Sequence, residues 1–341
     1  MTGEGTATRP SPNLLGILLA LILTAAAGVA DAQTVAVKAP ANDDCLACHS
    51  DPDVKRANGT SLAVDPSVFE HSKHGPLACV DCHQDLAKVQ EFPHAEKLAK
   101  VSCSTCHDAE AAKYHDSIHA WAKEKAGLTA AAPACADCHG SHNIKGPDEA
   151  TSRVSRANIP ATCGSCHQGV DAKYQTSVHV AAIKHGDAAP VCTDCHTAHT
   201  IQRADTPAWR LSVANECGTC HGEVVESFRR TFHGKVTELG FTRVAACADC
   251  HGAHDILPAA NPASMVSKAR LVETCSKCHQ GANESFVKYD PHPNPHNYAR
   301  SPLMWWVNRF YVVLIGGCFG FFGLHSALWF RRSWRNGKDR S

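Results

Sequence analysis

The sequence predicts a mainly α-helical protein with extensive loops, almost no sheet and one C-terminal transmembrane helix. Three observations predict this fold. Eighteen of the 19 cysteines fall into nine copies of the pattern Cys-x-x-Cys-His, the copies recur with a period of about 57 residues, and residues 310–330 form an apolar run without a charge. The roughly 270 residues from position 33 to 303 leave about 30 per motif, which suits short helices and loops.

Cys-x-x-Cys-His is the attachment signature of c-type haem. Two thiols three positions apart reach both vinyl groups on one porphyrin edge, and the adjacent His lies under the iron as its proximal ligand. Zinc sites do not require a His after every second Cys, and disulfides leave the histidines unexplained. We therefore expect nine covalently bound haem c groups, held by Cys45, Cys48, Cys79, Cys82, Cys103, Cys106, Cys135, Cys138, Cys163, Cys166, Cys192, Cys195, Cys217, Cys220, Cys247, Cys250, Cys275 and Cys278. The proximal ligands are His49, His83, His107, His139, His167, His196, His221, His251 and His279.

The motifs alternate in two series. One series starts at Cys45, Cys103, Cys163, Cys217 and Cys275, and the other at Cys79, Cys135, Cys192 and Cys247. The sequence therefore contains four two-motif repeats, numbered 1 to 4 from Cys45, Cys103, Cys163 and Cys217, and a half-repeat from Cys275. We expect them to stack as a haem-packed, elongated ectodomain, with helices over residues 110–125, 172–184 and 223–235.

Each iron needs a second axial ligand if all nine are six-coordinate, and the repeats supply candidates. A Ser/Thr-x-His motif places His119, His179 and His233 16 positions beyond the first Cys of repeats 2 to 4, and Cys-His-x-x-His supplies His142, His199 and His254. Repeat 1 departs from this pattern and offers His74 and His94. The ninth ligand is one of His292 and His296, and His71 is a further candidate. We assign His115 and His185 to surface or propionate contacts.

Both ends of the chain carry apolar segments. Residues 1–32 have the form of a signal peptide, with an apolar stretch from Leu14 and an Ala-Asp-Ala site before Gln33; an uncleaved anchor is the alternative. We expect residues 33–300 to form the periplasmic nonahaem domain. Residues 301–341 then hold a transmembrane helix over about 305–330 and a short basic tail, which the positive-inside rule places in the cytoplasm; a buried core helix is the alternative.

Charge limits the choice of partners. The 33 basic and 33 acidic residues balance, and residues 33–303 alone carry a net charge of −4, before the haem propionates are counted. An acidic ectodomain disfavours nucleic acid and other anionic polymers as partners.

Residues 45–296 resemble multihaem c-type cytochromes with doubled Cys-x-x-Cys-His motifs. The Phe-x-His71-x-x-His74 segment resembles the motif of small tetrahaem cytochromes c3, in which both histidines are distal ligands. The segment from Trp306 to Trp329 resembles the first membrane helix of a dihaem cytochrome b561 or hydrogenase b-type subunit, as in bacterial c/b-type menaquinol oxidoreductases. That resemblance implies that the remaining helices belong to another polypeptide.

His325 is the ionisable residue of this span, and such residues are functional candidates. It could face a shared b-type haem or a quinone; a hydrogen bond to a neighbouring carbonyl is the structural alternative. Gly316, Gly320, Gly323 and Ala327 form a small-residue stripe for helix packing, and Cys318 has no partner.

These features favour an electron-transfer subunit of a quinol-linked complex at the bacterial inner membrane, rather than an enzyme by itself. The expected partners are a b-type cytochrome membrane subunit with the quinol pool on one side, and periplasmic or outer-membrane cytochromes on the other, as in anaerobic respiration. The alternatives are a multihaem reductase of nitrite, hydroxylamine or a sulfur oxyanion, and a tethered haem wire without a b-type partner. Every motif ends in His, with no Cys-x-x-Cys-Lys, which disfavours the reductase.

Overall fold

A computed structural model describes residues 38–338, with side chains to residue 336. The expected signal peptide at 1–32 and the end of the basic tail lie outside the described residues. The described chain forms two compact bodies. The first takes in the residues up to Cys45 together with Ala78–Lys100, and the second takes in Leu46–Leu77 and the chain from Val101 onward.

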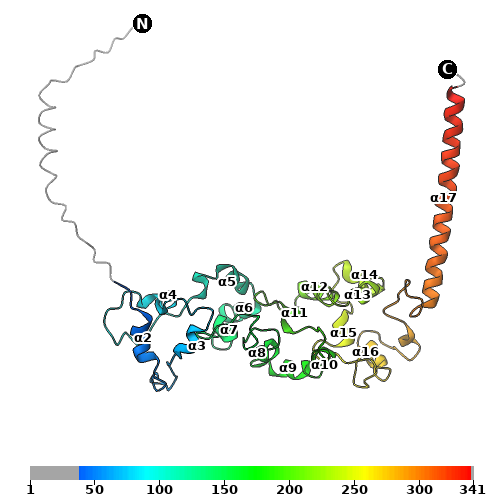
Figure 1. The fold of residues 1–341 in the computed structure, drawn as a ribbon. Coiled ribbons are helices and arrows are strands. Elements are labelled where there is room, and N and C mark those ends of the chain that lie inside the picture. The colour runs from blue at the N-terminus through cyan, green and yellow to red at the C-terminus, as the bar shows by residue number, and fades with distance from the viewer. Residues whose placement is uncertain (1–37, 339–341) are drawn as a thin grey trace, which may run out of the picture. The chain divides into compact units, whose positions relative to one another are not determined.

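Short helices joined by loops make up the haem-motif region (Figure 1). They are α2 (Asn42–His49), α3 (Pro66–Glu70), α4 (Cys79–Cys82), α5 (Asp108–His115), α6 (Ile118–Glu124), α7 (Cys135–His139), α8 (Ile159–Gly164), α9 (Gln168–Tyr174), α10 (Val178–Lys184), α11 (Cys192–His196), α12 (Pro207–Gly218), α13 (Gly222–Arg229), α14 (Phe232–Glu238), α15 (Cys247–His251) and α16 (Leu271–Ser276), with 3₁₀ turns η1 (Gln84–Leu86), η2 (Cys103–Thr105) and η3 (Phe286–Lys288). Among residues 38–338, strand pairing is limited to one isolated bridge between Lys55 and Ser61. The expected mainly helical fold is confirmed.

The three helices expected after the first motifs are each broken into two. The span 110–125 is α5 and α6, 172–184 is α9 and α10, and 223–235 falls within α13 and α14. The break has a local cause, because Ser117, Ser177 and Thr231 adopt extended backbone and cap the second helix of each pair. Each hydroxyl accepts the N–H three residues on, at 3.2–3.3 Å. The cap turns the chain immediately before each Ser/Thr-x-His histidine.

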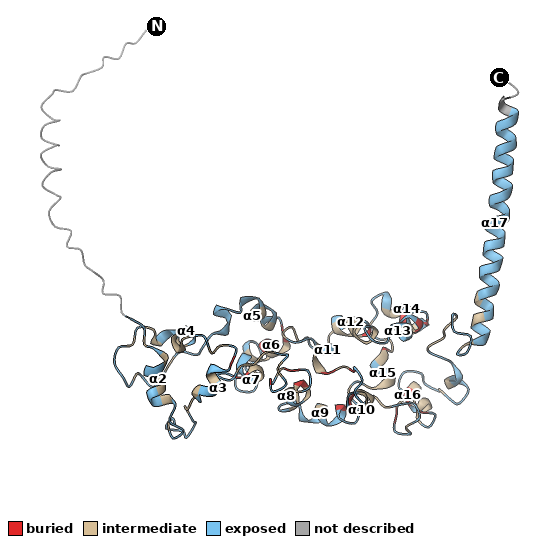
Figure 2. Cartoon of the chain, viewed as in Figure 1, coloured by how far each residue is buried: buried red, intermediate tan, exposed pale blue. Residues whose placement is uncertain are grey.

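The buried apolar side chains of the described residues are few and small. Four of the nine are Ala, and the largest are Tyr174 and Ile159. Many buried positions are Ser or Thr, and Figure 2 shows buried residues only in short, separate stretches. A chain of this length with so little buried hydrocarbon depends on other groups for its stability.

The last described helix differs from the rest. α17 (Pro302–Lys338) has 37 residues, and none of its residues as far as 336 is buried (Figure 2). The most apolar 18-residue window within Pro302–Asn336 has a mean hydropathy of 1.7 and none of it is buried, which makes this helix a candidate membrane span.

Candidate haem-binding sites

Seven of the nine predicted proximal histidines lie opposite a second histidine. The pairs, with the distances between ring centroids, are His107–His74 (6.0 Å), His139–His199 (5.8 Å), His167–His119 (6.2 Å), His196–His254 (6.0 Å), His221–His179 (6.4 Å), His251–His292 (6.1 Å) and His279–His233 (5.9 Å). The angles between ring planes run from 18° to 42°. The distance is nearly the same in all seven pairs, although the paired histidines lie at different intervals along the sequence. This indicates that the pairs have the same role.

This distance suits two imidazoles that ligate one iron from opposite faces. A His–metal bond is about 2 Å long and the ring centroid lies about 1 Å behind the nitrogen, so two such rings have centroids about 6 Å apart. A direct ring stack in the same region, between His196 and Trp209, has its centroids 4.8 Å apart. The donor set therefore fits haem with two axial histidines.

The pairs obey two rules. For a motif of the first series, the second ring comes from the preceding repeat, as His119 of repeat 2 faces His167 of repeat 3. For a motif of the second series it comes from further along the chain, as His254 of repeat 4 faces His196 of repeat 3. Each site in the seven is therefore completed by a neighbouring repeat.

Burial keeps these imidazoles in the form that binds iron. Partial burial is the main cause that lowers the pKa of His119, His179, His196, His251 and His254. The facing histidine lowers the pKa further for the first four, because two like charges would repel. A neutral imidazole has a free nitrogen lone pair, which is what a metal ligand requires.

In repeats 1, 3 and 4, the first thiols of the two motifs are neighbours. A hydrogen bond between the Cys163 and Cys192 thiols raises the pKa of Cys163 and lowers that of Cys192. The same contact between Cys217 and Cys247 lowers the pKa of Cys247 to about 7. In repeat 1, burial raises the pKa of Cys79 to about 11, and neighbouring Cys45 adds to the effect.

Motifs of successive repeats also adjoin. Burial raises the pKa of Cys138, and nearby Cys163 of the next repeat raises it further. Cys217 acts in the same way on Cys195, and Cys275 acts on Cys250. With the contacts inside repeats 3 and 4, these neighbours connect the six motifs from Cys135 to Cys275 without a gap.

An aspartate in the second motif of each repeat was not singled out from the sequence. The pattern there is Cys-x-Asp-Cys-His, and the carboxylates of Asp81, Asp137, Asp194 and Asp249 each accept the N–H of the residue before the first Cys at 2.7–2.8 Å. This bond starts the single helical turn that holds both thiols and the His. In repeats 3 and 4, Arg156 and Arg210 pair with Asp194 and Asp249 at 2.8 and 2.9 Å. The recurrence of Asp at the same position of all four second motifs is the sequence signal that could have identified it.

The remaining candidates have other contacts. His71 is exposed and its Nδ1 donates to the Ser67 carbonyl at 2.6 Å, while His94 Nδ1 donates to the Ala95 carbonyl at 2.8 Å. The ring of His142 lies edge-on to Phe69 at 6.5 Å. His296 makes no ring contact with another histidine in the described part of the chain, whereas His292 does.

Other histidines lie apart from these pairs. His49 Nδ1 donates to the Leu62 carbonyl at 3.0 Å, and His115 contacts Glu124 at 2.8 Å on the surface. His325 lies within α17. Their roles, and the second ligands for His49 and His83, stay predictions.

Comparisons with known proteins agree with these observations. The family described as cytochrome c7 and related cytochrome c matches residues 67–140. A curated protein, the multiheme cytochrome MtrA of Shewanella baltica (strain OS185), is 28% identical over 199 residues, which cover 53% of this chain and 53% of that protein. The chain thus spans about half the length of the curated relative that it matches. No solved structure matches the chain.

The matches and the cysteine motifs together support a multihaem c-type cytochrome with covalently bound haem c. The candidate membrane span at the C-terminus is consistent with this assignment.

Proposed function

We propose that this multihaem c-type cytochrome is a membrane-anchored nonahaem relay, which carries electrons between a quinol-linked b-type cytochrome module and periplasmic redox partners. The observation that carries the proposal is the set of seven histidine pairs with ring centroids 5.8–6.4 Å apart. Haem c, when bound, supplies one-electron chemistry at a potential that its axial ligands and exposure tune.

The chain's own residues favour transfer over substrate reduction. In each of the seven pairs, the spacing of the two rings would let both histidines hold one iron, which would leave no axial position for a substrate. A reductase needs an open or weakly held place where substrate binds. The sequence supplies enough further histidines for the sites of His49 and His83 to be six-coordinate as well.

The cysteine contacts support a continuous path. The thiols of Cys138, Cys163 and Cys192, and those of Cys195, Cys217 and Cys247, adjoin in series. Thioether bonds from adjoining thiols would hold neighbouring haem groups close together. Such a chain hands electrons on through short steps rather than storing them at one centre.

The C-terminal helix supports the membrane end of the proposal. α17 is long and apolar enough to cross a bilayer, and it carries His325 in its interior. An imidazole at that depth is costly to bury unless it binds something. We assign it a b-type haem or quinone held jointly with helices of another subunit, at the inner membrane with the cysteine motifs on the periplasmic side.

A pyridine haemochrome assay on gently extracted protein tests the proposal, with EPR on the same sample. We expect about nine haem c per chain, co-purifying b-type haem and low-spin spectra. A high-spin signal in the unmodified protein would support the reductase instead. Haem c alone, without b-type haem, would contradict the b-type module.

His325→Ala separates the b-type module from a tethered wire. If the module is present, reduction of the haem c groups by a quinol analogue slows at least tenfold, while reduction by dithionite is unchanged. Ser326→Ala, one position along the same helix, is the matched control. Unchanged quinol-driven reduction in His325→Ala would favour the wire.

A further inference from the structure

One backbone contact recurs between successive repeats. The residue before a second-ligand histidine donates its main-chain N–H to an isoleucine carbonyl: Lys73 to Ile144 at 2.8 Å, Ile118 to Ile201 at 2.7 Å and Val178 to Ile256 at 2.8 Å. Each isoleucine lies two residues beyond the Cys-His-x-x-His of the following repeat. Three equivalent contacts therefore dock the loop after one second motif onto the preceding repeat.

In the described part of repeat 4, the equivalent surface beside the second-ligand histidine has no such loop docked on it. We call this surface the uncovered edge. Phe232 holds the equivalent position before His233, but the half-repeat that follows has no second motif. Within residues 38–338 no carbonyl accepts the Phe232 N–H, and 78% of its side chain is exposed. His292 does face His251, yet the carbonyl two residues beyond it, on Asn294, accepts the Asn297 N–H at 3.2 Å instead.

The uncovered edge is also the apolar one. Leu239 is 86% exposed and Phe241 52% exposed, at positions six and eight beyond the histidine. The equivalent positions are Lys125 and Gly127 in repeat 2, and His185 and Asp187 in repeat 3. Phe232 is the first residue of α14 and Leu239 is its C-cap, seven residues on, so both lie on the same side of the helix. Exposed apolar side chains gathered in this way mark interaction surfaces.

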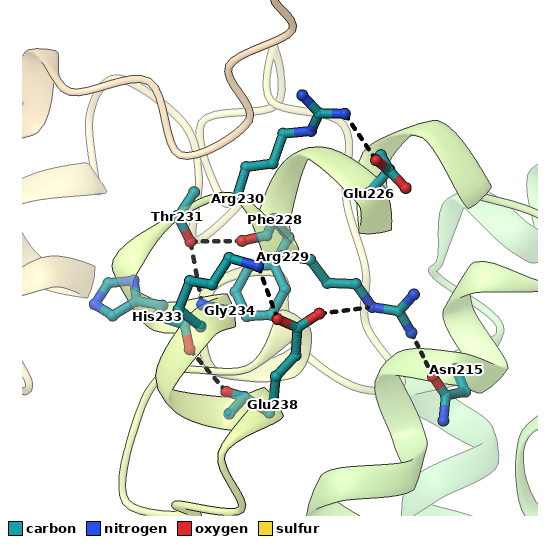
Figure 3. Close-up of polar contacts among 11 residues, drawn as sticks. Asn215, Glu226, Phe228, Arg229, Arg230, Thr231, His233, Gly234 and Glu238 are labelled. Atoms are coloured by element: carbon teal, nitrogen blue, oxygen red, sulfur yellow. Dashed lines mark hydrogen bonds and ion pairs between the residues drawn. The ribbon is translucent and has the colours of Figure 1, made fainter. Parts of the chain in front are cut away.

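The helix that carries this edge is firmly held (Figure 3). Thr231 Oγ1 donates to the Phe228 carbonyl at 2.7 Å and accepts the Gly234 N–H at 3.2 Å. The Glu238 carboxylate accepts a hydrogen bond from Lys235 at 3.0 Å and forms an ion pair with Arg229 at 3.7 Å. Arg229 also donates to the side-chain oxygen of Asn215 in α12 at 2.7 Å. These contacts tie α14 to α12 and α13, so a partner meets a preformed surface.

We propose that the edge formed by Phe232, Leu239 and Phe241 docks a separate c-type cytochrome, through a loop that follows a Cys-His-x-x-His motif on that partner. The equivalent positions of repeats 1 to 3 each take such a loop, through Lys73, Ile118 and Val178. A second copy of the chain fits poorly, because its own loops at Ile144, Ile201 and Ile256 are already bound within it. The contact would place the partner's attachment site beside those of repeat 4; the inference rests on the proposed relay function.

Photo-crosslinking in native membranes tests the site. With Phe232→p-benzoylphenylalanine in the full-length holoprotein, irradiation should give an intermolecular adduct with a haem-staining protein, and mass spectrometry should locate the link beside a Cys-His-x-x-His motif. Ile118→p-benzoylphenylalanine is the positive control, which should link within the chain near Ile201. A haem-free protein, a second copy or no intermolecular adduct, while the control links, would overturn the proposal.

A charge at the edge provides the second measurement. Adding Leu239→Glu to the photo-crosslinking chain should lower the adduct yield about tenfold, because an unpaired carboxylate is costly to bury. Leu128→Glu, at another exposed leucine, is the matched control and should leave the yield unchanged. Haem content and quinol-driven reduction are measured on the same samples. If they are normal while the adduct fails, the docking site alone is wrong; if they fail in the unmodified chain, the relay function is wrong.

Discussion

The indole of Trp209 lies parallel to the imidazole of His196, with ring centroids 4.8 Å apart and 2° between the planes. His196 in turn faces His254 at 6.0 Å, with 18° between those rings. Trp209 belongs to α12 (Pro207–Gly218), which Thr206 caps through the Trp209 N–H at 3.2 Å. The stack thus restricts rotation of the His196 ring.

Trp209→Leu is therefore expected to alter one of the nine proposed sites. Without the stack, the His196 ring gains rotational freedom, and the low-spin EPR signal of that site should shift or broaden while haem content stays constant. Trp121→Leu removes a half-exposed indole that contacts Arg203 rather than a histidine, and serves as control. An unchanged spectrum in Trp209→Leu would show that the ring is held by other contacts.

His292 and His296 are distinguished by a pair of variants. His292→Ala should leave nine haem c groups attached, since the thioether bonds come from cysteines, but should produce a high-spin signal from the site of His251. His296→Ala should leave the spectrum low-spin. The opposite result would make His296 the ligand.

Gly234→Ala is expected to disturb the site of His279. A Cβ at this position would overlap the Phe228 carbonyl oxygen and lie 2.6 Å from the Arg229 Cα, so α14 must move away from α13. Overpacking of this kind costs about 1–3 kcal/mol of unfolding free energy. Denaturant unfolding followed by circular dichroism measures it, and Gly169→Ala, which meets open space, is the control. An unchanged free energy of unfolding in Gly234→Ala would contradict the close packing.

Loss of the Ser177 cap should destabilise α10, the helix that carries His179. Ser177 is 2% exposed and its hydroxyl accepts the Val180 N–H at 3.3 Å. Ser177→Ala is expected to lower the free energy of unfolding by about 1 kcal/mol, as for other Ser caps. Ser50→Ala, at an exposed serine, should have no measurable effect; equal effects in both variants would argue against the capping role.

The sequence was sufficient for the local features and insufficient for the pairing. The interval of 16 residues from Cys163 to His179 marks a recurring motif, but the ring that faces His179 belongs to His221 of the next repeat. Sequence spacing cannot find such a partner, because the contact depends on how repeats pack. The helix break at Ser177 was missed since the residues on both sides favour a helix, and only the cap geometry separates them.

The last half-repeat shows a similar limit. His292 lies where spacing from Cys275 suggests the ligand of a first-series site. The structure instead sets it against His251, where it stands in for the missing fifth second motif. The Nδ1 of His292 lies 3.2 Å from the hydroxyl of buried Ser227, which is 65 residues earlier in the sequence.

The order of the paired histidines along the chain has a consequence for maturation. In the first series the facing ring precedes its motif, as His119 precedes Cys163, so a chain delivered from its N-terminus already carries the second ligand when that motif emerges. In the second series the ring follows, as His254 follows Cys192, and the site must wait for the next repeat to arrive. Completion of the histidine pairs, rather than covalent attachment, would then advance in alternating early and late steps along the chain.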